Sequence, residues 1–197
     1  TGRVGVCLAT SGPGATNLVT GIATAYMDSV PMVAITANVP DNLIGRDAFQ
    51  ETDLIGMTTP ITKWSYQIRR AEDVAWAVSR AFYIAGSGRP GPVVLDFTKD
   101  AQTGLAEFKP CRCNFIRSYV PDPEVPQEAI EKAAGMINAA ERPFVVYGQG
   151  VLMSGAEKEL GDFLDKADIP AGSTLLGLSA LPSAFFWQLM TILDEME

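Results

Sequence analysis

The segment Cys7–Asp28, CLATSGPGATNLVTGIATAYMD, constrains the fold of this chain more than any other part of the sequence. An apolar run leads into a Ser-Gly-Pro-Gly turn, and a helical pattern of small and apolar residues follows at once. A strand, a glycine-rich turn and a helix in this order are typical of α/β domains, in which the turn presents backbone N–H groups to a ligand. The turn is therefore either a ligand-binding element, a phosphate cradle included, or a plain tight connection.

Apolar runs continue to alternate with helical patterns further along the chain. This alternation implies right-handed crossovers and a mostly parallel sheet. Four prolines and little periodicity predict a linker at 103–126, after which the alternation starts again. The predicted strands are 3–10, 31–37, 63–68, 91–98, 143–148 and 169–175, the first, second and fourth of them buried, and the predicted helices are 15–28, 73–85, 127–140 and 156–167.

Composition narrows the classes of function. The net charge of −8 argues against nucleic acid and anionic membranes as partners. We also expect no membrane span and no signal peptide, and three cysteines suit a reducing compartment, which predicts a cytoplasmic protein. The chain has no histidine, so histidine-based catalysis is excluded and a cofactor is expected to carry the chemistry of an enzyme. Because the sequence begins with Thr just before a strand, we expect it to come from the middle of a larger protein.

Several motifs together identify a family. TSGPGATN (10–17), DSVPMVAIT (28–36), RDAFQETD (46–53), ITKWSY (61–66) and SGRPGPVVLDFTKD (87–100) follow one another as in acetolactate synthase large subunits, also called acetohydroxyacid synthases. The resemblance covers residues 1–183 and implies an α/β fold. Residues 1–102 resemble the C-terminal part of a pyrimidine-binding domain of thiamine diphosphate enzymes, and residues 127–183 resemble the start of a Rossmann-like central domain associated with FAD. Residues 184–197 form a tail that departs from the family.

The resemblance implies an active site around Gln50. It places Pro13, Asn17 and Gln50 beside thiamine diphosphate, with Gln50 as the catalytic amide. A neutral amide can donate a hydrogen bond to a substrate oxygen without adding charge, although a loop glutamine more often faces solvent. The resemblance also implies a channel for substrates and inhibitors, with an apolar wall and two lysines near its mouth. One of these lysines, Lys99, could equally be a solvated side chain. These channel residues are Pro40, Ala48, Phe49, Lys63 and Lys99.

The resemblance also implies contacts with FAD and two further cofactor anchors outside this chain. A Gly-x-Gly sequence just after a strand suits close approach to a ligand. The catalytic glutamate and the site for Mg²⁺ and the diphosphate lie in other parts of the family's sequence, so we assign no metal ligand here. A metal or redox role for Cys111-Arg-Cys113 is not favoured, because no other Cys or His completes a site. The expected FAD contacts are Ser29, Arg89, Gly148, Gln149, Gly150, Thr174 and Leu175.

The activity implied by the resemblance is the condensation of two pyruvates, or of pyruvate and 2-oxobutanoate, to 2-acetohydroxy acids with release of CO₂. Such products feed branched-chain amino acid biosynthesis. The implied partners are 2-oxo acids, a second copy that dimerises through the pyrimidine-binding domain, and a regulatory small subunit. We expect the isolated chain to be inactive because it lacks the glutamate and the Mg²⁺ site.

Other functions remain open on the sequence alone. One alternative is another thiamine diphosphate carboligase or decarboxylase acting on glyoxylate, oxalyl-CoA or sulfoacetaldehyde. Another is a non-catalytic dimerisation fragment. An NAD-binding Rossmann domain fits poorly, because the turn lacks the Gly-x-Gly-x-x-Gly spacing.

Overall fold

The computed structural model describes residues 2–182. The chain divides into two compact units, residues 1–123 and residues 124–197. Each unit contains a parallel sheet with helices, which confirms the predicted α/β fold class.

The first unit is built on a four-stranded sheet in the order β1-β2-β4-β3. All neighbouring strands are parallel, so every strand ends at the same edge of the sheet. The prediction of a parallel sheet is confirmed. Its strands are β1 (Gly5–Ala9), β2 (Met32–Ala37), β3 (Trp64–Ile68) and β4 (Pro92–Phe97).

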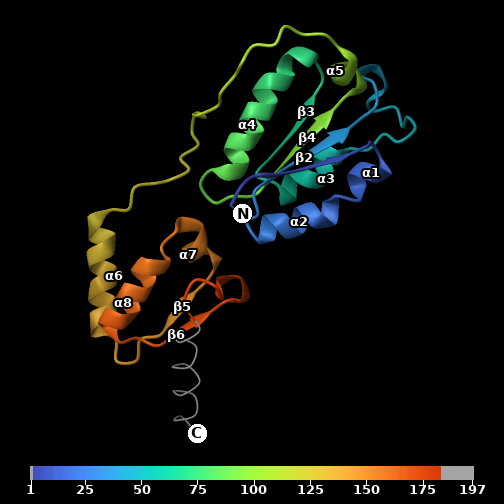
Figure 1. Ribbon diagram of the computed structural model, residues 1–197. Helices are drawn as coiled ribbons and strands as arrows, with labels where there is room; N and C mark the ends of the chain where they lie inside the picture. The colour runs from blue at the N-terminus through green and yellow to red at the C-terminus, as the bar shows by residue number, and fades with distance from the viewer. Residues whose placement is uncertain (1, 183–197) are drawn as a thin grey trace. The chain divides into compact units, whose positions relative to one another are not determined.

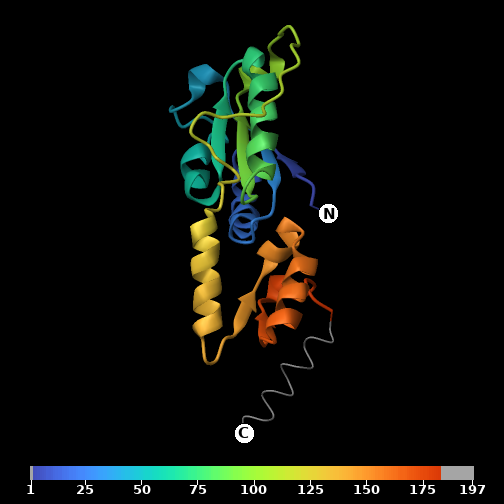
Figure 2. The same ribbon diagram turned by 90° about the vertical axis from the view of Figure 1, so that its left-hand side faces the viewer.

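Helices cover both faces of this sheet (Figures 1 and 2). The helix α4 (Val74–Gly86) packs its alanines against Val33, Val93 and Leu95 on one face. On the other face, α2 (Val19–Met27) and α3 (Leu54–Thr58) pack against the alternate strand residues Ala34 and Val94. Full burial of a Leu, Ile or Val side chain stabilises the fold by about 1.5–3 kcal/mol, so the central strands account for much of the stability.

The predicted burial of the first strand is wrong. Val6 is 58% exposed and Leu8 is 77% exposed. In the described part of the chain, β1 pairs with β2 alone and therefore forms an edge of the sheet. An apolar run resembles a central strand, but burial also requires neighbours on both sides.

The predicted helix at 15–28 is two shorter helices, α1 (Pro13–Thr16) and α2, which meet at Asn17 and Leu18. A further helix, α5 (Lys99–Thr103), was not predicted. It begins at Thr98, whose hydroxyl accepts a hydrogen bond from the Ala101 N–H at 3.3 Å, as an N-cap does.

Residues 104–123 contain no helix or strand and contact α4 and the turn that follows it. The Cys113 N–H donates to Ser79 Oγ at 2.7 Å, and the Tyr119 hydroxyl donates to the Ser87 carbonyl at 3.0 Å. The assignment of this segment as an interdomain linker stays a prediction.

The second unit has a two-stranded parallel sheet and three α-helices in its described part. Tyr147, Leu164, Ile169 and Leu181 form its core. The helix after the first strand was not predicted, and the predicted tail 184–197 lies outside the described residues. The elements are α6 (Gln127–Ala139), β5 (Val145–Tyr147), α7 (Gln149–Ser154), α8 (Glu157–Ala167) and β6 (Ala171–Ser173). No helix within residues 2–182 has the length and apolar character needed to cross a membrane.

Candidate functional site

The turn after β1 and the loop after β2 meet at the carboxyl edge of the first sheet. A Cβ atom on Gly12 would lie 2.9 Å from the Cβ of Gln50 and 3.0 Å from its Cα, so the two backbones are in direct contact. The Ser11 hydroxyl donates a long hydrogen bond of 3.5 Å to Gln50 Oε1. Because Pro13 follows Gly12 directly, the structure brings Pro13 and Gln50 to the same edge of the sheet.

Both residues of this contact have left-handed backbones. Gly12 has φ 57° and Gln50 has φ 60°. Glycine adopts this conformation freely, whereas a residue with a Cβ pays about 1–2 kcal/mol. Strain of this kind persists only where the surroundings enforce it, and it clusters at functional sites. Gln50 is exposed, so its amide is accessible to a ligand.

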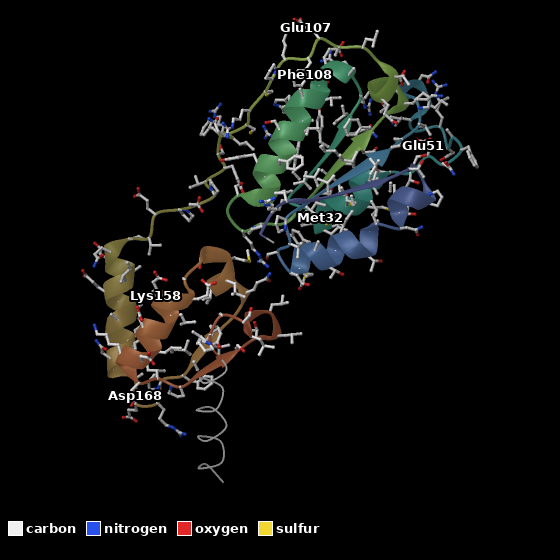
Figure 3. All side chains as sticks on the ribbon, viewed as in Figure 1. Met32, Glu51, Glu107, Phe108, Lys158 and Asp168 are labelled. Carbon is white, nitrogen blue, oxygen red and sulfur yellow. The ribbon has the colours of Figure 1, made fainter. Side chains whose placement is uncertain are left out.

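Glu51 folds the tip of this loop around its own carboxylate. The carboxylate accepts hydrogen bonds from the N–H groups of Gly45, of Arg46 at 3.3 Å and of Ala48 at 2.9 Å. These bonds, first that from Gly45, lower the pKa of Glu51 below its ordinary value. Figure 3 shows Glu51 in this loop, toward the opposite end of the sheet from Met32 at the start of β2. Glu51 therefore has a structural role in shaping the tip that carries Gln50.

Sequence reasoning missed the polar group beneath the loop. Asp96 is fully buried on β4, and its carboxylate accepts a hydrogen bond of 2.7 Å from the Asn38 amide at the end of β2. The signal was an acidic residue inside the apolar run GPVVLDFT, because a buried carboxylate requires donors around it.

The other residues predicted for the thiamine site and the channel lie on the same edge, with one exception. Phe49 is 88% exposed at the loop tip, and Ala48 beside it is half-buried. The Lys99 N–H donates to the Val39 carbonyl at 3.4 Å, which brings the start of α5 next to Pro40. Asn17 is exposed at the end of α1.

The exception is Lys63, which precedes β3 at the amino edge. Its ammonium group donates to the carbonyls of Ile84 and, at 2.7 Å, of Ser87, and to the Tyr119 hydroxyl at 3.0 Å. These partners take all the donors of an ammonium group. The structure does not bring Lys63 next to Gln50, and its role at the channel mouth stays a prediction.

Ser29 and Arg89, both predicted to contact FAD, lie together at the amino edge. Arg89 Nε donates to Ser29 Oγ at 2.7 Å. Ser29 is buried with a left-handed backbone of φ 55°, while Arg89 is exposed. The pair therefore joins the turn before β2 to the turn before β4, on the edge opposite Gln50.

The predicted FAD contacts of the second unit lie at the ends of β5 and β6. A Cβ atom on Gly148 would lie 3.0 Å from Thr174 Oγ1, and the Thr174 N–H donates to the Tyr147 carbonyl at 2.8 Å. Leu175 follows Thr174 and is 81% exposed. Gln149 and Gly150 begin α7. Within residues 2–182, no group of three acidic, Cys or His side chains is placed to hold a metal ion.

Two family models of known proteins match parts of this chain. Residues 1–57 match the family described as "Thiamine pyrophosphate enzyme, N-terminal TPP binding domain". Residues 130–190 match "Thiamine pyrophosphate enzyme, central domain". The two matches fall in the two units of the structure.

Individual relatives are similar over most of the chain. The acetolactate synthase large subunit of Buchnera aphidicola is 46% identical over 184 residues, which cover 92% of this chain and 32% of the relative. Acetolactate synthase of Arthrospira platensis is 46% identical over 179 residues, which cover 90% of this chain and 31% of the relative. The acetolactate synthase large subunit of Corynebacterium glutamicum is 45% identical over 185 residues, which cover 93% of this chain and 29% of the relative.

The chain thus spans about a third of the length of these relatives. Both thiamine pyrophosphate domain matches and the similarity to large subunits lead to the same assignment. The chain belongs to the thiamine pyrophosphate-dependent acetolactate synthase family.

Proposed function

We propose that this chain supplies the Gln50 wall of an acetolactate synthase active site. The reaction joins two pyruvates, or pyruvate and 2-oxobutanoate, to a 2-acetohydroxy acid with loss of CO₂. The contact between Gly12 and Gln50 is the observation that carries the proposal, because it brings the turn and the loop of the two main motifs to one place. When bound, thiamine diphosphate supplies the carbanion stabilisation that decarboxylation of a 2-oxo acid requires.

The residues at this edge fit the neutral end of the cofactor. The turn SGPGATN carries no charged side chain, which suits a neutral pyrimidine ring. Gln50 Oε1 accepts a hydrogen bond from Ser11, which leaves the Gln50 NH₂ group to donate to a ligand. An amide held in this way can stabilise charge that develops on a substrate oxygen. We assign Pro13 and Asn17 to the same cofactor, and Pro40, Ala48, Phe49, Lys63 and Lys99 to the substrate channel.

We also propose that the amino edge contributes to an FAD site. Arg89 is an exposed guanidinium held by a buried serine, which suits the diphosphate of FAD. In the second unit, Gly148 lies close to Thr174 because it has no side chain. We propose that the backbone at the ends of β5 and β6 is the part of this unit that contacts FAD. Gln149, Gly150 and Leu175, which lie next to this backbone, are the further residues that we assign to FAD.

We propose a homodimer through the first unit and a regulatory small subunit, in the cytoplasm, where the free Cys7, Cys111 and Cys113 stay reduced. Mg²⁺ and the catalytic glutamate come from other parts of the full-length enzyme, so the isolated chain is inactive.

A chimaeric enzyme tests this proposal. Residues 1–182 of this chain replace the matching segment of Arthrospira platensis acetolactate synthase, and product is measured with thiamine diphosphate, Mg²⁺ and FAD present. We expect acetolactate from pyruvate, and none from the isolated chain under the same conditions. A chimaera that folds but turns over only glyoxylate, oxalyl-CoA or sulfoacetaldehyde would support a different thiamine enzyme. One that turns over nothing would support a non-catalytic role.

A further inference from the structure

The carboxylate of Asp96 lies beneath the loop that carries Gln50, and it is held by hydrogen bonds. Asp96 is fully buried, and none of the ion pairs found in residues 2–182 includes it. Its oxygens accept from Thr36 Oγ1 at 2.8 Å, from Asn38 Nδ2 at 2.7 Å and from Gln67 Nε2 at 3.0 Å. Donors from two other strands and from the loop therefore converge on one buried charge, which is costly to bury unless it is satisfied in this way.

Asn38 connects this carboxylate to both ends of the loop. Its Nδ2 also donates to the Thr52 carbonyl at 3.3 Å, and its Oδ1 accepts from the Val39 N–H at 2.8 Å. The loop comprises residues 38–53, so residues 38 and 39 lie at its start and residue 52 near its end. One amide side chain therefore closes the base of the loop. Hydrogen bonds to a charged, buried acceptor are stronger than those to exposed groups.

The remaining contacts of the loop explain why the base matters. Apart from the contacts of Gln50 with Gly12 and Ser11, the tip is folded around Glu51 and is tied to itself. Asp41 is tied to the neighbouring elements by an ion pair with Arg69 at 3.3 Å and by its N–H, which donates to Asp100 at 2.7 Å, but these groups are exposed. Exposed pairs of this kind contribute little.

We propose that Asp96 is a positioning residue that holds the base of the 38–53 loop closed through Asn38 and so places Gln50 against Gly12. That this placement matters for catalysis rests on the function proposed above. The placement of Gln50 by Asp96 does not depend on that function. Asp96 touches neither substrate nor cofactor in this account. It acts through the loop.

Two test substitutions and one control separate this role from general stabilisation. Asn38→Ala removes the amide that joins the carboxylate to the loop. Thr36→Val is the matched control, because it removes another hydrogen bond to the same carboxylate from a buried position on β2 and nearly preserves side-chain volume. Asp96→Asn is a second test variant, since it removes the charge while it keeps the shape.

The experiment is amide hydrogen exchange and NMR on the whole 197-residue chain without cofactor. In Asn38→Ala, and more weakly in Asp96→Asn, we expect exchange at residues 39–52 to speed up, by about tenfold in Asn38→Ala, while β2 and β4 stay protected. The nuclear Overhauser contact between Gly12 Hα and Gln50 Hβ should be lost in Asn38→Ala and kept in Thr36→Val.

Survival of that contact in Asn38→Ala, or equal loosening of the loop in Thr36→Val, would overturn the proposal. Because no thiamine diphosphate is present, the outcome is independent of the proposed function. Turnover by the chimaera tests that function separately, so the positioning role of Asp96 and the proposed function can fail independently.

Discussion

Gly12 and Gln50 touch through their backbones, because a Cβ atom added to Gly12 would stand 3.0 Å from Gln50 Cα and from the Gln50 carbonyl oxygen. A side chain at position 12 would not fit this approach, and Gln50 meets Gly12 with a left-handed backbone of φ 60°. The turn after β1 and the loop after β2 thus form one surface, on which the predicted thiamine residues lie.

Replacement of Gly12 by alanine should separate these two segments. The new Cβ would overlap backbone atoms that cannot move cheaply, and the φ of 57° would add strain. We expect Gly12→Ala to lower the free energy of unfolding by about 1–3 kcal/mol, measured by urea denaturation. Gly21→Ala is the matched control, because nothing lies within 4 Å of its new Cβ in α2. It should raise stability by about 0.5–1 kcal/mol, and equal losses in both variants would contradict the account.

Lys63 should stabilise the first unit through its contacts at the end of α4. Lys63→Met leaves the carbonyls of Ile84 and Ser87 without their charged donor, so we expect a loss of about 1–3 kcal/mol in thermal or urea unfolding. Lys158→Met is the control, since Lys158 pairs with Asp162 at 2.7 Å on an exposed surface of α8. Such a pair contributes about 0.3–0.5 kcal/mol. Comparable losses in the two variants would argue against a structural role for Lys63.

The loop tip should respond to pH through Glu51. Its pKa is lowered from 4.5 in the folded chain, so the stability that it contributes is fully present above that value. This stability is lost as the pH falls through the lowered folded pKa. NMR titration of the Gly45 and Ala48 amides should show a transition below pH 4.5, and Glu51→Gln should abolish it. A transition at or above the ordinary pKa of glutamate would show that the carboxylate does not hold the loop.

Much of the fold follows from periodicity in the sequence. The runs PMVAITA and GPVVLDFT predict central strands because apolar residues on both faces require helices on both sides, and β2 and β4 meet this expectation. The same rule fails for β1, where Val6 and Leu8 are exposed. Burial depends on which neighbours a strand finds, and local sequence does not contain this information.

The site was only partly predictable for a similar reason. Ser29 and Arg89 lie 60 residues apart, and the motifs could suggest a shared ligand but not the hydrogen bond between them. The role of Asp96 was not predicted, because a single acidic residue does not change the strand pattern of an apolar run. Its significance appears only when β2, β3 and β4 bring their polar side chains together at one edge.

The most direct test of the central claim is the turnover of the chimaeric enzyme with Gln50→Ala. If the Gln50 amide stabilises charge in the active site, kcat for acetolactate formation should fall about a hundredfold, as when one such donor is removed elsewhere. Asn42→Ala, an exposed polar residue of the same loop, should leave kcat unchanged. A Gln50→Ala chimaera that keeps the kcat of its parent would contradict the account.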